Sequence, residues 1–292
     1  MTTNANQANN DYRSTADEFA AAFSAEKHQS FTLTPADDPV GGALLVHGFP
    51  GTPAELRPLA ESLRTAGWVA QGILLPGFGP QIATLAERRM EDWLAALRSA
   101  ATALKAEHRP TLLIGNSMGA ALTLAAAAEI RPDGLVLVNP FSKLDNILWN
   151  FLPALKFVVP KFKPFSLTKI DFADPEARAG IAEFMPDADL DDPTVQQQIK
   201  DFSIPTRILD EIRRAGVAGY QAAPQIPMPV LIIQGDRDML VSPASTQALA
   251  ARIAGPVTYH EVDGEHNLIN ETQACWSQVE QLVRAFAASL IS

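Results

Sequence analysis

The fold is decided by the stretch TLLIGNSMGAALTLAAAAEI at residues 111–130. Its first four residues form a short apolar run typical of a buried strand, and its alanine-rich second half is typical of a helix. Between them, Gly115 and Gly119 lie two residues on either side of Ser117. In so tight a strand-to-helix turn, larger side chains at these two positions would collide with neighbouring backbone. The stretch therefore predicts a sharp turn that projects the Ser117 hydroxyl at the carboxyl edge of a sheet.

Short apolar runs alternate with helical segments on both sides of this turn. The alternation predicts an α/β fold, with a mostly parallel sheet covered by helices on both faces. The expected strands are residues 43–46, 68–75, 111–114, 134–138, 230–234 and 257–261. The expected helices are residues 52–66, 93–107, 118–130, 245–253 and a last one from about residue 271.

Residues 141–226 interrupt this alternation. They contain no apolar run comparable to the expected strands, and prolines and aromatic residues break them repeatedly. We therefore expect a mainly helical cap at residues 141–226, inserted into a core formed by residues 26–140 and 227–292. The polar stretch at the start of the chain predicts a flexible tail over residues 1–25.

Composition limits the classes of protein to which the chain can belong. Its 292 residues suit one α/β domain with an insertion, and its 47% of hydrophobic residues excludes disorder, collagen and coiled coil. A net charge of −10 opposes binding to nucleic acid. The single cysteine, Cys275, can form no internal disulfide and shares no metal site with another cysteine. No apolar run reaches the roughly 20 residues that cross a bilayer, so we expect a cytoplasmic protein. We also expect it to hold no metal.

Ser117 needs a base, because a serine hydroxyl is a poor nucleophile at neutral pH. Of the five histidines, His266 is the favoured base because it lies in a polar loop at residues 263–267, between the last expected strand and the last helix. A side chain in that loop can reach over the edge of the sheet. A carboxylate would then orient the imidazole.

The orienting acid is expected to follow the strand at residues 230–234. Asp238 is favoured because Val241, three residues later, returns to the apolar interior and anchors the loop. Asp236 would stabilise the turn and stays open as an alternative acid, and Asp145 is a third candidate. The chain order of Ser117, Asp238 and His266 is the order expected for this kind of site.

The turn His47-Gly48-Phe49-Pro50-Gly51 follows the first expected strand. We expect the backbone N–H groups of Phe49 and Met118 to form an oxyanion hole, and Pro50 cannot contribute because it has no N–H. His47 precedes the glycine of this turn directly, so we expect it to make structural hydrogen bonds.

The next residues predict the start of a helix. Thr52 would accept a hydrogen bond from the Glu55 amide, while the Glu55 side chain reaches back to the start of the helix. Pro53 suits the first helical position, and Gly67 would end the helix in a left-handed conformation.

Four segments along the chain resemble the successive signatures of the α/β-hydrolase superfamily: LLVHGF at residues 44–49, GNSMG at 115–119, GDRD at 235–238 and GEH at 264–266. The resemblance spans about residues 40–290. Within it, HGFPGTPAELRPLAESLRTAGW at residues 47–68 and LLPGFG at residues 74–79 resemble the bacterial carboxylesterase and monoacylglycerol lipase branch. Glu265 departs from the family pattern, which often has glycine directly before the histidine.

The resemblance implies hydrolysis of short- to medium-chain carboxylic esters, including monoacylglycerols, through an acyl-enzyme at Ser117 and without a cofactor. The implied partner is a small ester with an apolar acyl chain. Two alternatives stay open. GNSMG also resembles hydrolases that cleave carbon–carbon bonds in ring-fission products, and the fold can serve as a non-catalytic ligand-binding protein.

The first part of the cap mixes positive charge with aromatic residues. Residues 141–170 carry five lysines and one aspartate. As an amphipathic lid, this part would receive an apolar substrate, and Phe141 and Trp149 are the residues expected to bind it. The alternative is that these aromatic side chains pack on the main domain.

Overall fold

The computed structural model describes residues 20, 23, 25–142, 152–153, 159, 161–162, 171–174, 177–178, 181, 189–201 and 203–291. At its centre lies a seven-stranded sheet with the order β1-β3-β2-β4-β5-β8-β9. All neighbouring strands are parallel except β1 and β3, which confirms the mostly parallel sheet. The strands are β1 (Phe31–Leu33), β2 (Gly41–Val46), β3 (Trp68–Ile73), β4 (Thr111–Asn116), β5 (Gly134–Val138), β8 (Val230–Gly235) and β9 (Val257–Val262).

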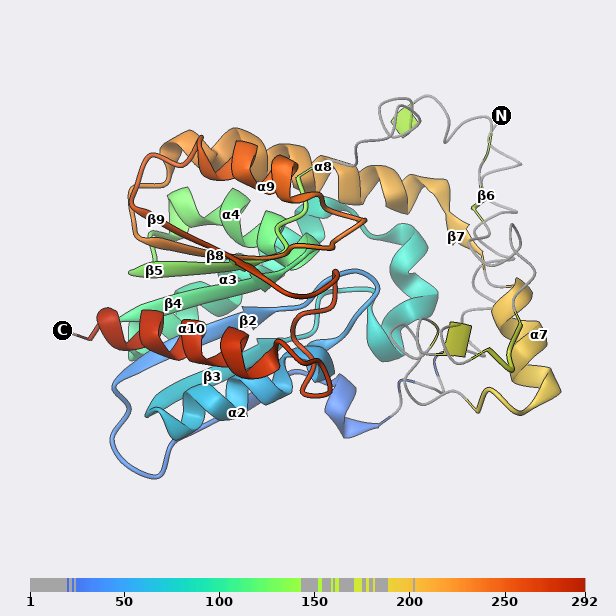
Figure 1. Cartoon of the computed structure of the whole chain (residues 1–292), viewed down its shortest axis with the longest axis horizontal. Coiled ribbons are helices and arrows are strands. Elements are labelled where there is room, and N and C mark those ends of the chain that lie inside the picture. The colour runs from blue at the N-terminus through green and yellow to red at the C-terminus, as the bar shows by residue number, and fades with distance from the viewer. Residues whose placement is uncertain are drawn as a thin grey trace.

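Helices cover both faces of the sheet (Figure 1). One layer consists of α3 (Met90–Glu107), α4 (Met118–Ile130), α8 (Thr206–Ala222) and α9 (Pro243–Ala250), and the other of α2 (Arg57–Thr65) and α10 (Trp276–Ser289). Successive side chains of a strand point to opposite faces, so Leu113 of β4 packs in the first layer while Leu112 and Ile114 pack in the second. The residues of β2, β5 and β8 are all buried, as expected for parallel strands that helices cover on both sides.

The expected elements are confirmed, with differences at some ends. The helix at 118–130 and the strand at 134–138 have the predicted bounds. Gly67 ends α2 with a φ of 88°, which is the left-handed conformation predicted for it. The last helix begins at Trp276 and not near 271, because Asn270 accepts hydrogen bonds from the amide and hydroxyl of Thr272 and so stabilises a turn there.

The predicted helix at 52–66 is wrong in its first turn. A 3-10 helix, η3 (Pro53–Leu56), precedes α2, and Thr52 accepts a hydrogen bond from Ala54 at 3.4 Å. The Glu55 side chain does not reach back to the start of the helix, because its carboxylate accepts from Gly48. The antiparallel edge strand β1 was not predicted; it has only three residues and none of them is fully buried.

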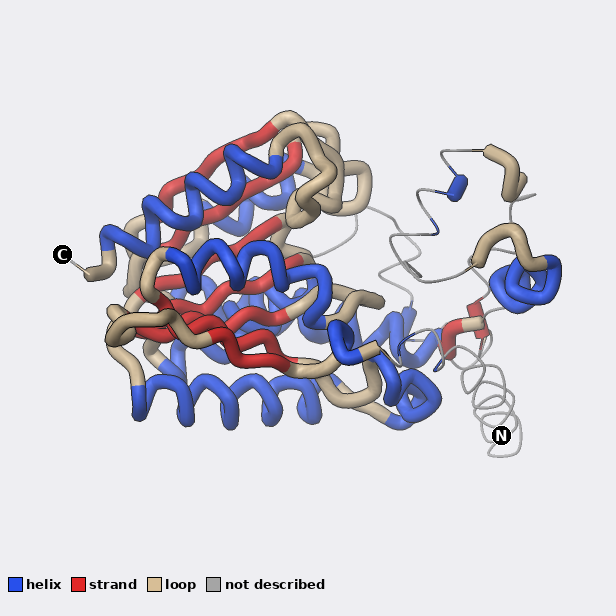
Figure 2. The backbone as a smooth tube through the Cα atoms, turned by 90° about the horizontal axis from the view of Figure 1, so that it is seen from below, coloured by secondary structure: helices blue, strands red, loops and turns tan. Residues whose placement is uncertain are grey.

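Part of the chain between β5 and β8 lies beyond the end of the sheet that is opposite the C-terminus. Figures 1 and 2 both place α7 (Pro193–Asp201) and the two-stranded pair of β6 (Lys161–Phe162) and β7 (Ile204–Pro205) there. Three further 3-10 helices complete the described elements: η2 (Glu26–His28), η4 (Gly79–Glu87) and η6 (Ala223–Gln225).

Helix α8 returns the chain from this region to the sheet. It packs closely on α4, and a side chain at Gly219 would meet the carbonyl oxygen of Ala121 at 2.7 Å. Gly216 likewise faces the carbonyl oxygen of Ser142 at 2.5 Å. By its contacts, α8 therefore belongs to the helix layer that covers the sheet, although it falls within the expected cap of residues 141–226.

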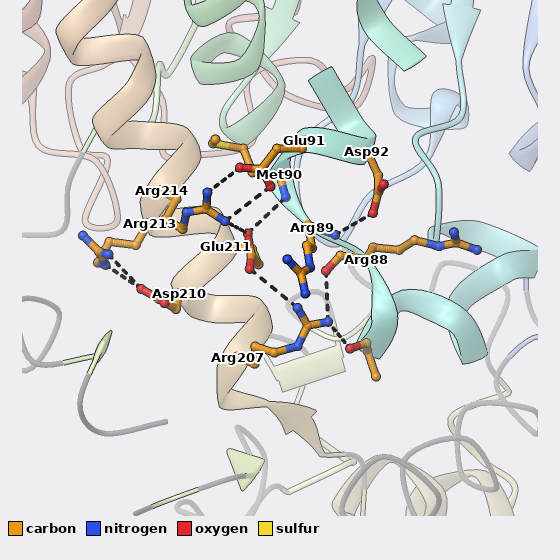
Figure 3. A network of polar contacts seen from close by, with 11 residues as sticks. Arg88, Arg89, Met90, Glu91, Asp92, Arg207, Asp210, Glu211, Arg213 and Arg214 are labelled. Carbon is orange, nitrogen blue, oxygen red and sulfur yellow. Dashed lines mark hydrogen bonds and ion pairs between the residues drawn. The ribbon is translucent and has the colours of Figure 1, made fainter. Parts of the chain in front are cut away.

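An ion-pair network holds α8 to the start of α3 (Figure 3). The buried Glu211 carboxylate lies 2.5 Å from Arg214 and 3.5 Å from Arg207, and it accepts from the Met90 amide at 3.1 Å. Arg214 also pairs with Glu91 of α3. The network thus joins the start of α3 to α8, although Met90 and Glu211 are 121 positions apart in the chain.

Within the described ranges, no helix combines the length and the apolar character needed to cross a membrane.

Candidate active site

The turn between β4 and α4 has the predicted sharp geometry. The backbone of Ser117 adopts φ 51° and ψ −114°, a conformation that residues other than glycine rarely adopt. A side chain at Gly115 would meet backbone atoms of Ala120 at 2.5 Å, and one at Gly119 would overlap the carbonyl oxygen of Val46. The collisions predicted for larger residues at 115 and 119 are therefore confirmed.

The structure brings Ser117, His266 and Asp238 together. His266 Nε2 lies 2.9 Å from Ser117 Oγ, and His266 Nδ1 lies 2.7 Å from Asp238 Oδ2. A carboxylate can only accept, so Nδ1 carries the proton and Nε2 accepts from the serine hydroxyl. These contacts join residues that are 149 and 28 positions apart in the chain. The arrangement can remove a proton from Ser117 Oγ and hold the resulting imidazolium against a carboxylate.

Backbone amides fix the orientation of the Asp238 carboxylate. Its Oδ1 accepts from the N–H groups of Leu240 and Val241, both at 2.8 Å, and its Oδ2 accepts from the histidine and, at 3.3 Å, from Gln234 Nε2. Val241 is fully buried, as the anchoring argument predicts. Asp236 instead accepts from the Gly264 amide at 3.1 Å and so stabilises the turn. Asp145 lies outside the described residues.

Sequence reasoning missed Asn139, which connects three loops of the site. Its side-chain amide donates to the His266 carbonyl at 2.5 Å, and its side-chain oxygen accepts from the Gly235 amide at 2.8 Å. Asn139 is fully buried and has a φ of 42°, a conformation that asparagine tolerates better than most residues. The signal in the sequence was an asparagine directly after a buried strand, followed by proline.

His47 makes the structural hydrogen bonds predicted for it. Its Nδ1 donates to the Gly48 carbonyl at 2.8 Å, and its Nε2 accepts from the Leu75 amide at 3.1 Å. Burial lowers the pKa of His47 to about 4, against a smaller opposite effect of the bond to Gly48. Both ring nitrogens are engaged, so the imidazole has no free atom for a substrate.

The two backbone amides expected to form an oxyanion hole belong to the loop and the helix next to Ser117. Within the described part of the chain, the N–H groups of Phe49 and Met118 have no hydrogen-bond acceptor. The Phe49 amide belongs to the loop whose Gly48 packs on the serine turn, since a side chain at Gly48 would meet Ser117 Cβ at 3.3 Å. Met118 begins α4, where the first N–H groups of a helix have no partner within the helix.

Glu55 contributes a second carboxylate next to these loops. Its Oε1 accepts from the Gly48 amide at 2.8 Å and from Asn116 Nδ2 at 3.0 Å. Burial raises the pKa of the Glu55 carboxyl, whereas the bonds from Asn116 and Gly48 and the nearby imidazole of His266 act in the opposite direction.

Of the two residues expected to bind substrate, Phe141 packs inside the fold. Phe141 donates from its backbone N–H to the Ser117 carbonyl at 3.2 Å, but its side chain is only 5% exposed and contacts Gly216 of α8. Its packing agrees with the alternative interpretation of this aromatic residue. Trp149 lies outside the described residues.

Comparison with known families gives one match that spans most of the chain. The family model described as serine aminopeptidase, S33, matches residues 37–273. The match includes the serine turn and the loops that carry Asp238 and His266.

Two curated proteins are similar in sequence. A thermostable monoacylglycerol lipase from Bacillus sp. (strain H-257) is 39% identical over 100 residues, which are 34% of this chain and 40% of that enzyme. This chain thus matches less than half of the length of that lipase. A monoacylglycerol lipase from Mycolicibacterium smegmatis is 24% identical over 263 residues, which are 83% of this chain and 90% of that enzyme.

Among solved structures, one from a study of LipS and LipT, two metagenome-derived lipolytic enzymes, is similar with a TM-score of 0.71. It covers 90% of this chain and 98% of its own, with 18% sequence identity. At this level of identity, the likeness shows the α/β-hydrolase fold.

Proposed function

This chain belongs to the serine aminopeptidase, S33, family of hydrolases, and we propose that it hydrolyses carboxylic esters through an acyl-enzyme at Ser117. The observation that carries the proposal is the pair of hydrogen bonds from Ser117 to His266 and from His266 to Asp238. The proposed substrates are short- to medium-chain acyl esters, including monoacylglycerols. Both curated relatives are named monoacylglycerol lipases, which supports the monoacylglycerols among them.

The reaction follows from the geometry in two halves. In the first, Ser117 Oγ attacks the ester carbonyl while His266 Nε2 takes its proton; the bond to the alcohol oxygen then breaks, and His266 returns the proton to the departing alcohol. In the second, His266 deprotonates a water that attacks the acyl-enzyme; the bond between the acyl carbon and Ser117 Oγ then breaks, His266 returns the proton to Ser117 Oγ, and the carboxylic acid leaves. Asp238 keeps the imidazole in place, and the N–H groups of Phe49 and Met118 stabilise the negative oxygen of each tetrahedral intermediate.

Neither alternative function is favoured by the comparisons. The similar proteins are named for lipase and lipolytic activity, not for carbon–carbon cleavage. A complete set of hydrogen-bonded catalytic groups also opposes a purely ligand-binding role. We propose that Trp149 contributes to the substrate site, and that the protein acts in the cytoplasm, which its single cysteine supports.

The test is the initial rate of hydrolysis of nitrophenyl esters from C2 to C16. Ser117→Ala should lower kcat by about 10⁴-fold or more, because both halves of the reaction pass through the serine oxygen. Ser289→Ala, which removes a hydroxyl from the far end of α10, is the matched control and should keep the wild-type rate. An unchanged rate in Ser117→Ala would refute the proposal, and the chain-length optimum of the wild type reports the size of the acyl site.

A further inference from the structure

We propose that Glu55 is a positioning residue that fixes the oxyanion loop, residues 47–51, against the turn that carries Ser117. The inference rests on the proposed function, since it concerns the alignment of an oxyanion donor with the nucleophile. Glu55 touches neither of these groups itself. It acts through the residue that precedes each of them.

A single carboxylate oxygen makes both connections. Glu55 Oε1 accepts from the backbone N–H of Gly48 at 2.8 Å and from the side-chain amide of Asn116 at 3.0 Å. Gly48 directly precedes Phe49, and Asn116 directly precedes Ser117. The distance between the Phe49 amide and the Ser117 oxygen is therefore set partly by one shared acceptor.

Local backbone brings the carboxylate to this place. Glu55 lies in the first turn of η3, whose entry is held by Thr52, and the turn directs the side chain back over the loop. The second oxygen, Oε2, occupies the space that a side chain at Gly51 would fill. Glycine at residue 51 is thus what leaves room for the carboxylate beside the loop.

The contact does not depend on the charge of the carboxyl group. Burial raises the pKa of Glu55, whereas the bonds from Asn116 and Gly48 act in the opposite direction. The hydrogen bonds to Gly48 and Asn116 use an oxygen that accepts in either protonation state.

The direct test compares Glu55→Ala with Glu55→Gln. Glu55→Ala leaves the Gly48 N–H without its acceptor and lets the loop shift, which should lower kcat by about 10- to 100-fold with KM within about twofold. Glu55→Gln keeps an oxygen that can accept both bonds and should remain within about threefold of wild type. Glu61→Ala removes a half-buried carboxylate of α2 that pairs only with Arg64 among the described contacts, and it is the matched control, with unchanged kcat.

A second pair of variants tests the same contact without deleting the carboxylate. Gly51→Ala places a methyl group where Oε2 lies and should displace it, lowering kcat by a similar factor. Once Glu55 is alanine, the methyl group has no carboxylate to displace. The double variant should therefore be no slower than Glu55→Ala alone, a non-additive result that general loosening of the fold would not produce.

Labelling of Ser117 by a fluorophosphonate separates this proposal from the proposed function. The serine oxygen bonds to phosphorus, fluoride leaves, and the phosphonyl oxygen lies in the oxyanion hole, so the rate needs no ester substrate. If the wild type labels but hydrolyses no ester, the proposed substrate class fails while the ratio of labelling rates still tests Glu55. Equal labelling rates in wild type and Glu55→Ala, equal losses in Glu55→Ala and Glu55→Gln, or additive effects of Gly51→Ala would overturn the proposal.

Discussion

The polar residues of this site differ in how many of their hydrogen-bonding atoms the scaffold already uses. Asp238 gives one oxygen to two backbone amides and the other to His266. Both ring nitrogens of His47 are bonded to the backbone, whereas Nε2 of His266 faces the serine. Two histidines of the same chain thus have different roles, because only one keeps an atom directed at the reacting group.

His47 should make the stability of the protein depend on pH. The pKa of His47 in the folded protein is about 4, below the ordinary value of 6.5. Between these pH values the imidazole binds a proton in the unfolded chain but not in the folded protein. Stability is therefore full above pH 6.5 and is lost as the pH falls from 6.5 towards about 4. At pH 5, this loss amounts to about 2 kcal/mol.

Urea unfolding at pH 7.5 and pH 5 measures this contribution. His47→Gln carries no titrating group, so it should lose about 2 kcal/mol less than the wild type between the two pH values. Comparing the two losses cancels the other groups that titrate in this range. Equal losses in the two proteins would contradict the assignment.

At the scale of elements, α8 and α3 are joined by charged groups and not by apolar contact alone. Glu211 is almost fully buried, while the arginines paired with it are about one third exposed, at 33% and 37%. Figure 3 shows Glu91 of α3 paired with Arg214 of α8, so the network joins two helices that are far apart in the sequence. A buried carboxylate with several donors is the part of such a network whose loss leaves most groups without a partner.

Glu211→Ala should lower the free energy of unfolding by about 2–3 kcal/mol, since Arg207, Arg214 and the Met90 amide all lose an acceptor. Urea unfolding at neutral pH gives the value. Asp191→Ala, which removes an exposed partner of Arg178, is the matched control and should leave the unfolding midpoint unchanged. A Glu211→Ala protein as stable as the control would show that the network contributes nothing.

At the scale of the whole molecule, the long segment between β5 and β8 returns through α8 before the sheet continues. These two strands are neighbours in the sheet although residues 139–229 separate them. We propose that α8 behaves as part of the core, and that the expected cap ends before it. The close approach of Gly219 to the backbone of Ala121 supports this division.

Hydrogen exchange read by mass spectrometry tests the division. Peptides from α8 should exchange as slowly as those from α4, because both helices open only when the core unfolds. Peptides from α7 should exchange faster, since α7 makes no comparable contact with another described element. If α8 exchanged together with α7, the helix would belong to the cap.

Elements with strong local signals were predictable from the sequence. The helix at 118–130 is alanine-rich, and the turn before it needs glycine at residues 115 and 119. The buried strands are short apolar runs. Short or irregular elements were not predictable from the sequence. β1 exists because it pairs with β3, and η3 replaces a regular first turn because the Glu55 side chain bonds to Gly48. Local propensity carries no information about partners that are distant in the chain.

The sequence by itself determined where the six parallel strands lie along the chain, the serine turn and the residue types that chemistry at Ser117 requires, because each depends on neighbours within a few positions. Only the tertiary structure decided that His266 lies 2.9 Å from a serine 149 positions away, that Asn139 connects the surrounding loops, and that Glu55 bridges the oxyanion loop and the serine turn. These contacts form where parallel strands end at one edge of the sheet, and their distances are set by the packing of the whole core.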